Sequence, residues 1–151
     1  MHPKYISKKG LELIKKFEGL HKVKDGVVHP YVCPAGVLTQ GYGSTKGVKE
    51  GVTWTIDEAS DILKKDVNDH AEAVHAYVKV PLTQPQFDAL VSFVFNLGAG
   101  AFKSSTMLKK LNKGLMDEVP SEFMKWNKAR VNGKLTSLKG LTRRRTAEAA
   151  M

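Results

Sequence analysis

The chain has 151 residues, of which 42% are hydrophobic and 26% are charged, a composition that is ordinary for one globular unit with a buried core. No apolar run approaches the length that spans a bilayer, and the opening residues MHPKYISKKG lack the apolar centre of a signal peptide. We therefore expect neither a transmembrane segment nor an export signal. The single cysteine, Cys33, excludes an internal disulfide and favours folding in a reducing cytoplasm.

The net charge of +9 is concentrated in the last third of the chain. Residues 1–102 carry 12 Lys and Arg against 11 Asp and Glu, whereas residues 103–151 carry 12 against 4. The basic segment favours binding to an anionic polymer such as nucleic acid, a wall polymer, lipopolysaccharide or peptidoglycan. A solvated basic face that only aids solubility would look the same, and charge alone does not choose between these polymers.

A first helix is predicted to end at Glu18. Ser7 is placed as its N-cap and Gly19 follows its last residue. The apolar residues between them form one stripe, made of Leu11, Leu13, Ile14 and Phe17.

Residues 20–45 hold too many glycine, proline and β-branched residues for a helix. They indicate short strands joined by turns at Lys24-Asp25-Gly26 and Pro34-Ala35-Gly36. We therefore expect an early β-hairpin region after the first helix.

A long amphipathic helix is predicted to begin after Thr55, which forms a capping box with Glu58. One apolar face then continues for more than twenty residues, through Ile56, Ala59, Leu63, Val67, His70, Val74 and Val78. Pro81 ends the pattern. A helix of this length could join a small β-rich lobe to a larger helical one.

A second capping box, Thr83 with Gln86, predicts the next helix and tolerates Pro85 in its first turn. The following residues are apolar on nearly every side, which indicates a central buried helix: Phe87, Ala89, Leu90, Val91, Phe93, Val94, Phe95 and Leu97. Gly98 and Gly100 are expected to break it.

Shorter helices are predicted over residues 105–113 and 118–128, with Phe123 and Trp126 of the second facing inward. Asn132-Gly133 is expected to form a turn, and a last helix should begin after Gly140 or Thr142 and end near Met151. The whole pattern predicts an α+β protein. Its β-rich lobe would span about residues 20–54, and its helical lobe about residues 79–151 together with the first helix, as one domain.

Glu18 is the first candidate for chemistry. A glutamate at a helix end is most often a solvated surface charge. If Glu18 instead faces a cleft, the helix dipole and partial burial would both raise its pKa and make it a proton donor. Cleavage of a glycosidic bond needs such an acid and a second group on the opposite face of the sugar.

Cys33 and Thr39 are candidates for the second group, because a hairpin can bring both side chains to one face. A lone cysteine is often only a small buried apolar residue. A thiol beside a carboxylate stays protonated, so Cys33 would serve better in holding a water molecule than as a base. A cysteine-protease site with His29 lacks a completing Asn or Asp, and the histidines give no metal-ligand spacing.

Four motifs, KKFEG, YVCPAGVLTQGYGST, QFDALVSFVFNLGAGAFKSSTMLKKLN and GLTRRRTAE, occur in this order over nearly the whole chain. Together they resemble the phage lysozymes, or endolysins, of glycoside hydrolase family 24. The resemblance implies a two-lobed lysozyme-like fold with the cleft between the lobes. It also implies a catalytic triad of Glu18, Cys33 and Thr39 that cuts the β-1,4 bond from N-acetylmuramic acid to N-acetylglucosamine.

One spacing departs from the family's pattern. Fourteen residues separate Glu18 from Cys33 where the family has eight, so six extra residues must loop out around positions 22–29. The second spacing, from Cys33 to Thr39, is intact. Asp25 lies in the insertion and is the alternative for the carboxylate role, although such loops are usually solvated turns.

Further positions carry over from the resemblance as substrate-binding residues: Gly43, Phe95, Asn96, Ser105, Thr106 and Arg144. Phe95 has core packing as its alternative. Of the three arginines at positions 143–145, one is expected to reach towards Glu18, and Arg144 is the favoured choice. The alternative is a basic last helix that touches wall polymer.

The leading hypothesis is thus a lysozyme that needs no cofactor or metal, acts as a monomer on bacterial peptidoglycan and does not bind nucleic acid. Its basic last third would draw it to an anionic wall or outer-membrane surface. The resemblance implies accumulation in the host cytoplasm and release to the cell wall through a holin-type partner. The alternatives are a non-catalytic module that binds wall polymer and a lytic transglycosylase.

Overall fold

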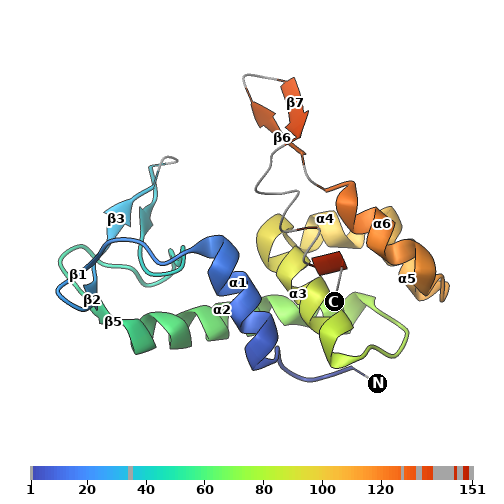
Figure 1. Cartoon of the computed structure of the whole chain (residues 1–151), viewed down its shortest axis with the longest axis horizontal. Coiled ribbons are helices and arrows are strands. Elements are labelled where there is room, and N and C mark those ends of the chain that lie inside the picture. Colours follow the sequence, from blue (N-terminus) through green and yellow to red (C-terminus); the bar gives the residue numbers. More distant parts are fainter. Residues whose placement is uncertain are drawn as a thin grey trace.

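The computed structural model describes residues 2–33, 36–126, 128–131, 134–137, 145 and 148–149. The helices are α1 (Lys8–Glu18), α2 (Ile56–Tyr77), α3 (Gln84–Leu97), α4 (Ala99–Lys103), α5 (Thr106–Asn112), the 3-10 turn η1 (Met116–Glu118) and α6 (Val119–Met124). The strands are β1 (Val23–Lys24), β2 (Val27–Val28), β3 (Tyr31–Val32), β4 (Leu38–Thr39), β5 (Trp54–Thr55), β6 (Lys128–Val131) and β7 (Lys134–Ser137). Figure 1 shows α2 starting at β5, beside β1 and β2, and running towards α3, with α4–α6 beyond it at the other end of the molecule.

We call residues 23–55, with strands β1–β5, the β lobe, and residues 84–126, with α3–α6, the helical lobe. The β lobe contains an antiparallel sheet in the order β1-β2-β5 and a separate hairpin, β3-β4. The sequence predicted short strands and turns over residues 20–45 but not β5, because its two residues directly precede α2 and carry no strand pattern of their own. The predicted α+β class is confirmed.

Helix α1 begins and ends as predicted. The Ser7 hydroxyl accepts a hydrogen bond from the Gly10 N–H at 3.0 Å, and Gly19 follows Glu18 with a φ of 74°. The Ser7 N–H and hydroxyl both donate to Asp88, a buried residue of α3. A Cβ at Gly10 would lie 2.6 Å from Asp88 Cγ, so glycine is required for this close approach of α1 to α3.

Both predicted capping boxes are present, Thr55 with Glu58 and Thr83 with Gln86. In α2 the buried face consists of Ala59, Leu63, Val67, Ala71 and Val74. His70, which the sequence placed on this face, is exposed instead. It follows the buried Val67 by three positions, and its ring lies edge-on to Phe95 at the margin of the core.

The central helix α3 carries eight consecutive buried residues, from Phe87 to Val94. Phe93 is fully buried, with ring centroids of Phe102, Phe123 and Trp126 within 5.4–6.2 Å. Gly98 ends α3 as predicted. Gly100 does not interrupt a helix, because it lies inside α4.

The predicted helix over residues 118–128 is too long. It is a 3-10 turn followed by α6, which ends at Met124, and Lys128 already belongs to β6. Leaving the helix at this point lets Trp126 pack edge-on against Phe93, with an interplanar angle of 86°. Arg145, Glu148 and Ala149 of the predicted last helix are helical, and the rest of it lies outside the described residues.

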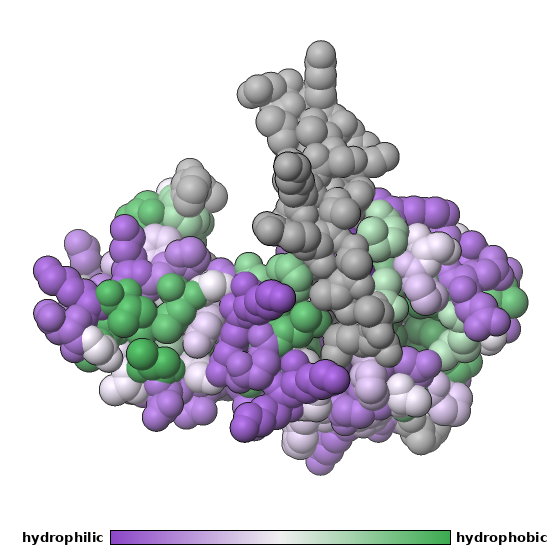
Figure 2. All heavy atoms as spheres, viewed as in Figure 1, coloured by the Kyte–Doolittle hydropathy of each residue, from purple (hydrophilic) through white to green (hydrophobic). Residues whose placement is uncertain are grey.

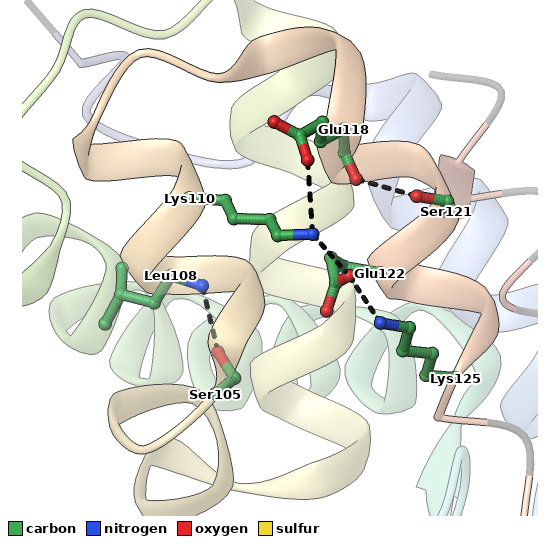
Figure 3. A network of polar contacts seen from close by, with 7 residues as sticks. All are labelled: Ser105, Leu108, Lys110, Glu118, Ser121, Glu122 and Lys125. Carbon is green, nitrogen blue, oxygen red and sulfur yellow. Dashed lines mark hydrogen bonds and ion pairs between the residues drawn. The ribbon is translucent and has the colours of Figure 1, made fainter.

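A buried carboxylate fixes α6 to α5. Lys110 of α5 and Lys125 lie 3.0 Å and 2.7 Å from Glu122 Oε2, and Lys110 also pairs with Glu118 at 3.4 Å (Figure 3). The Glu122 side chain is only 3% exposed. The two ammonium groups, Lys125 first and then Lys110, lower the pKa of Glu122, and Glu122 in turn raises the pKa of Lys110.

The strands β6 and β7 were not predicted. The two strands are antiparallel, with Lys128 opposite Ser137 at one end and Val131 opposite Lys134 at the other. The predicted Asn132-Gly133 turn between them lies outside the described residues. An Asn-Gly dipeptide between two short runs is a strong hairpin signal, and it could have revealed these strands.

The surface of the β lobe is partly apolar. Figure 2 shows hydrophobic residues gathered over this end of the molecule. The exposed large hydrophobic side chains there are Val23, Val32, Val37, Val52 and, at the start of α2, Ile56. Among the described helices, none is both long and apolar enough to cross a membrane.

Candidate active site

Glu18 ends α1 with its carboxylate directed at the β lobe. The side chain is half-buried, and a Cβ built on Gly43 would lie 3.6 Å from Glu18 Oε2. Gly43 belongs to the tight turn closed by the pairing of Gln40 with Ser44, and its φ of 88° is in the left-handed region that favours glycine. The carboxylate therefore lies against the backbone of this turn.

His21 connects the end of α1 to two parts of the β lobe, the turn at Gly41 and strand β3. Its N–H donates to the Gly41 carbonyl at 3.4 Å, and its Nε2 lies 3.2 Å from the Glu18 carbonyl oxygen. Its ring centroid is 5.6 Å from that of Tyr31 in β3. These contacts fix the position of Glu18 relative to the β lobe. No motif or spacing in the sequence pointed to His21.

The hairpin β3-β4 brings the two other predicted triad residues to one face. Tyr31 pairs with Thr39 in the antiparallel register, so these two side chains share a face of the hairpin. Cys33 is two residues after Tyr31, which places it on the same face. The Cys33 N–H donates to the Val37 carbonyl at 2.9 Å, so the pairing continues to that point.

Tyr31 is a member of this cluster that sequence reasoning missed. The pKa of its hydroxyl is raised, first by burial, then by Cys33 where its thiol ionises at alkaline pH, and then by the Glu18 carboxylate. The hydroxyl therefore keeps its proton over a wider pH range and can donate a hydrogen bond. Alternation within the Tyr-Val-Cys sequence could have placed Tyr31 and Cys33 together.

The Thr39 side chain is almost enclosed, with a residue exposure of 4%. Its hydroxyl donates to the Val37 carbonyl at 2.9 Å. Because a hydroxyl donates only one hydrogen bond, Thr39 Oγ1 can act towards a further group only as an acceptor.

Asp25, the alternative to Cys33, lies elsewhere. It occupies the exposed turn between β1 and β2, with a φ of 55°, next to Gly26 with a φ of 78°. This two-residue turn belongs to the three-stranded sheet and not to the β3-β4 hairpin. Its position gives no support to a role for Asp25 beside Glu18.

A cavity of about 320 Å³ adjoins this cluster between the β lobe and the helices. Its lining residues are Gly43, Ser44, Thr45, Lys46, Asp66, Asp69, His70 and Phe95. Two predicted substrate-binding residues, Gly43 and Phe95, thus meet here. Gly43 also lies against the Glu18 carboxylate, so one residue borders both the cavity and the acid.

Residues 15–148 match the family model described as phage lysozyme. The endolysin of Acyrthosiphon pisum secondary endosymbiont phage 1 is 47% identical over 97% of both chains. The endolysin of Bacillus phage B103 is 40% identical, and the match covers 95% of this chain but only 52% of that longer protein. The solved muramidase domain of SpmX from Asticaccaulis excentricus has a TM-score of 0.87 at 40% identity, covering 99% of this chain and 97% of that one.

The chain belongs to the phage lysozyme family. This confirms the predicted lysozyme-like fold and the predicted enzyme class, a glycoside hydrolase of the lysozyme type. It also confirms the predicted function, a muramidase endolysin that causes lysis. The match covers the segment that carries all three predicted triad residues.

Three other predicted substrate-binding residues, Asn96, Ser105 and Thr106, do not line the cavity. Ser105 is 2% exposed, and its hydroxyl caps α5 by accepting from the Leu108 N–H (Figure 3). The same hydroxyl donates to the Phe102 carbonyl. Thr106 is exposed at the first position of α5. Asn96 is partly exposed, but its Oδ1 is buried and accepts no hydrogen bond from the described residues.

Arg144, the predicted partner of Glu18, lies outside the described residues. The neighbouring Arg145 is fully buried and pairs with Glu148, with Nε 2.6 Å from Oε1. Its guanidinium lies 5.2 Å from the centre of the Phe93 ring, and Ser92 of α3 donates to the same glutamate. Arg145 and Glu148 thus pack as a pair against α3.

No cluster of three or more potential metal-ligating side chains occurs among the described residues.

Proposed function

We propose that this lysozyme hydrolyses the β-1,4 bond from N-acetylmuramic acid to N-acetylglucosamine in bacterial peptidoglycan, with Glu18 as the proton donor. The single observation that carries the proposal is the position of the Glu18 carboxylate against Gly43, next to the β3-β4 hairpin. A carboxylic acid held beside a cleft can protonate the oxygen of the leaving sugar.

The hairpin supplies the rest of the reaction. Thr39 Oγ1 accepts a hydrogen bond from the attacking water, since its own proton is committed to Val37. Cys33, on the same face, borders the water site. As Glu18 transfers its proton to the leaving oxygen, the C–O bond breaks and the water oxygen bonds to the anomeric carbon, releasing a proton to the Glu18 carboxylate or to solvent.

Tyr31 has a supporting role in this scheme. A tyrosine hydroxyl is protonated at neutral pH, and burial together with the Glu18 carboxylate raises its pKa further. It can therefore donate to the Glu18 carboxylate or to a sugar oxygen. We regard it as a positioning residue of the same site.

Replacing Glu18 tests the assignment. Glu18→Gln keeps the size and hydrogen-bonding capacity of the side chain but removes the acid, so hydrolysis should fall by about 10²–10⁴-fold, as for loss of a general acid. Release of reducing ends from purified peptidoglycan measures the rate, and circular dichroism checks the fold. Full activity in a folded Glu18→Gln variant would remove the proposal.

The product and Cys33 need separate measurements. Mass spectrometry of the digest should show hydrolysed reducing ends, whereas anhydro-sugars would identify a lytic transglycosylase.

Cys33→Ser should keep at least about a tenth of the activity if the residue only borders a water molecule. Near-complete loss in a folded variant would instead assign the thiol a direct part in the chemistry.

We further propose that the enzyme works as a monomer and that its basic residues 103–151 draw it to the anionic wall or outer-membrane surface. It would stay in the host cytoplasm until a holin-type partner releases it to the wall. The charge of this segment, 12 Lys and Arg against 4 Asp and Glu, supports the surface attraction. The fraction of enzyme that sediments with isolated cell walls should then fall as the salt concentration is raised through about 0.1 M, because salt screens the attraction.

A further inference from the structure

The cavity beside Glu18 has two unlike walls. Residues Ser44, Thr45 and Lys46 line it from the β lobe, and Asp66, Asp69 and His70 line it from α2. Phe95, at the end of α3, completes it. The acid Glu18 does not line this cavity, so these groups are available for binding another part of the substrate.

The charge of this cavity is opposite to that of the protein. The chain carries +9 overall, but two carboxylates, Asp66 and Asp69, face one ammonium group, Lys46, among the lining residues. Neither carboxylate forms an ion pair within the described part of the chain, although Lys65 is four positions before Asp69 on α2. Unpaired carboxylates in a cleft attract a cationic group.

Two further acceptors point to a ligand with several donor hydrogens. Ser44 is 5% exposed, and its buried Oγ has no hydrogen-bond partner among the described residues, an arrangement that costs free energy unless a ligand or water completes it. His70 Nδ1 lies 2.7 Å from the Asp66 carbonyl oxygen and must donate to it. In the neutral imidazole, Nε2 is therefore an acceptor.

An aromatic pair borders the same space. The His70 and Phe95 rings meet edge-on, with centroids 5.1 Å apart and an interplanar angle of 81°. Aromatic ring faces attract ammonium groups by cation–π interaction. Carboxylates, a hydroxyl, an imidazole nitrogen and an aromatic side chain form a set suited to an ammonium ion, which has hydrogens to donate and no lone pair.

We propose that this cavity binds a primary ammonium group carried by the glycan strand, with Asp69 and Asp66 as its carboxylate partners. The inference rests on the proposed peptidoglycan-cleaving function and names a substrate feature that the enzyme selects. Two sources present this chemistry: the side-chain amine of a stem peptide that is not cross-linked, and the amino group of an N-deacetylated glucosamine. The contact lies beside the reacting bond, so it affects binding more than the chemical step.

Substrate acetylation tests the proposal. Purified peptidoglycan is divided, and one half is treated with acetic anhydride, which converts free amines to neutral amides. For the wild-type enzyme, acetylation should raise KM about fivefold with little change in kcat, the size expected for a partly exposed charge-assisted contact. Initial rates of reducing-end release give both constants.

Matched variants assign the effect to this cavity. Asp69→Asn should raise KM on the untreated substrate and remove the sensitivity to acetylation, and Asp66→Asn should act in the same direction. Asp61→Asn makes the same change at an exposed position of α2 that does not line the cavity, so it should behave like the wild type. Circular dichroism confirms that each variant is folded.

A third substrate distinguishes the sources. Glycan strands freed of stem peptides by an amidase, and then partly N-deacetylated, should be bound tightly if the sugar amine is recognised and weakly if the stem-peptide amine is recognised. An unchanged wild-type KM after acetylation, or undiminished sensitivity in Asp69→Asn, would overturn the proposal. If the wild type cleaves none of these substrates, the proposed function itself fails, which is a different result.

Discussion

The two lobes of this lysozyme are built by different means. Each strand of the β lobe has only two residues, and its turns depend on positive-φ positions such as Gly41 and Gly43. The helical lobe is organised around α3, with eight consecutive buried residues. Regular structure thus stabilises one lobe, whereas individual turns and side chains hold the other. The predicted triad lies at the end of α1 and in the lobe with least regular structure.

A buried amide compensates in part for the short strands. The Gln40 side chain is fully buried and donates to the Val28 carbonyl at 2.8 Å and to the Val52 carbonyl at 3.0 Å. Its backbone pairs with Ser44 across the glycine turn. One residue therefore joins the sheet, the loop before β5 and the turn that faces Glu18. This explains how strands of two residues can hold a precise site.

The largest contrast between the lobes should appear when an aromatic side chain is truncated. Phe93→Ala removes the ring on which Phe102, Phe123 and Trp126 pack, and should lower the free energy of unfolding by about 3–5 kcal/mol. Val32→Ala, in the β lobe at 65% exposure, should change it by less than about 0.5 kcal/mol. Urea denaturation measures both.

If Phe93→Ala does not fold, Phe93→Leu provides the same comparison with a smaller loss. Equal effects of the Phe93 and Val32 substitutions would show that stability is not concentrated in the helical lobe.

Most of the longer helices were predictable because their signals are local. The sequence correctly predicted the capping boxes at Thr55 and Thr83, the helix ends at Gly19 and Gly98, and the apolar run of α3. Such signals depend on residues within a few positions of each other. The predicted end of α6 was wrong because Trp126 packs against Phe93, a residue far away in the sequence.

The candidate site was predictable only in outline. The hairpin pattern and the family motifs indicated Glu18, Cys33 and Thr39. The positions of His21 and of Asp66 and Asp69 at the cavity follow from contacts between distant segments, which no spacing in the sequence encodes. The predicted substrate contacts all stay predictions, including those of Gly43 and Phe95, which line the cavity, and those of Asn96, Ser105, Thr106 and Arg144.

The turn that faces the acid should be sensitive in a way that the helical lobe is not. Gly43→Ala forces a side chain into a φ of 88°, which should cost about 1–2 kcal/mol. Relief of this strain moves the turn against Glu18, so kcat/KM should fall by about tenfold or more. Thermal denaturation and reducing-end release measure the two effects. Activity at the wild-type level would show that the turn does not position the acid.

A pH-dependent effect is expected in the helical lobe. Lys125 and Lys110 lower the pKa of Glu122, so the folded state is stabilised above the ordinary glutamate pKa, and this contribution is lost as the pH falls below about 4.5. Glu122→Gln should destabilise the protein at pH 7 by about 1–2 kcal/mol. The difference from the wild type should shrink on acidification. Denaturation of both proteins at pH 7 and pH 3 measures it, and a constant difference would contradict this.

The smallest expected effect has the opposite sign. Gly100 lies inside α4, and a Cβ there would meet nothing within 4 Å. Gly100→Ala should therefore stabilise the protein by about 0.5–1 kcal/mol through the lower entropy of the unfolded chain, with unchanged activity. It is the matched control for Gly43→Ala, because it makes the same substitution in the other lobe. A loss of stability would mean that α4 needs glycine for a reason that its surroundings do not show.

The packing of the two tryptophans has a practical consequence. Trp54 is buried in β5 opposite Val28, whereas Trp126 lies against Phe93. These are the only two indole groups in the chain, one in the β lobe and one in the helical lobe. Trp54→Phe and Trp126→Phe variants would therefore each emit from a single lobe. Intrinsic fluorescence could then follow the loosening of either end during denaturation or wall binding, without an attached dye.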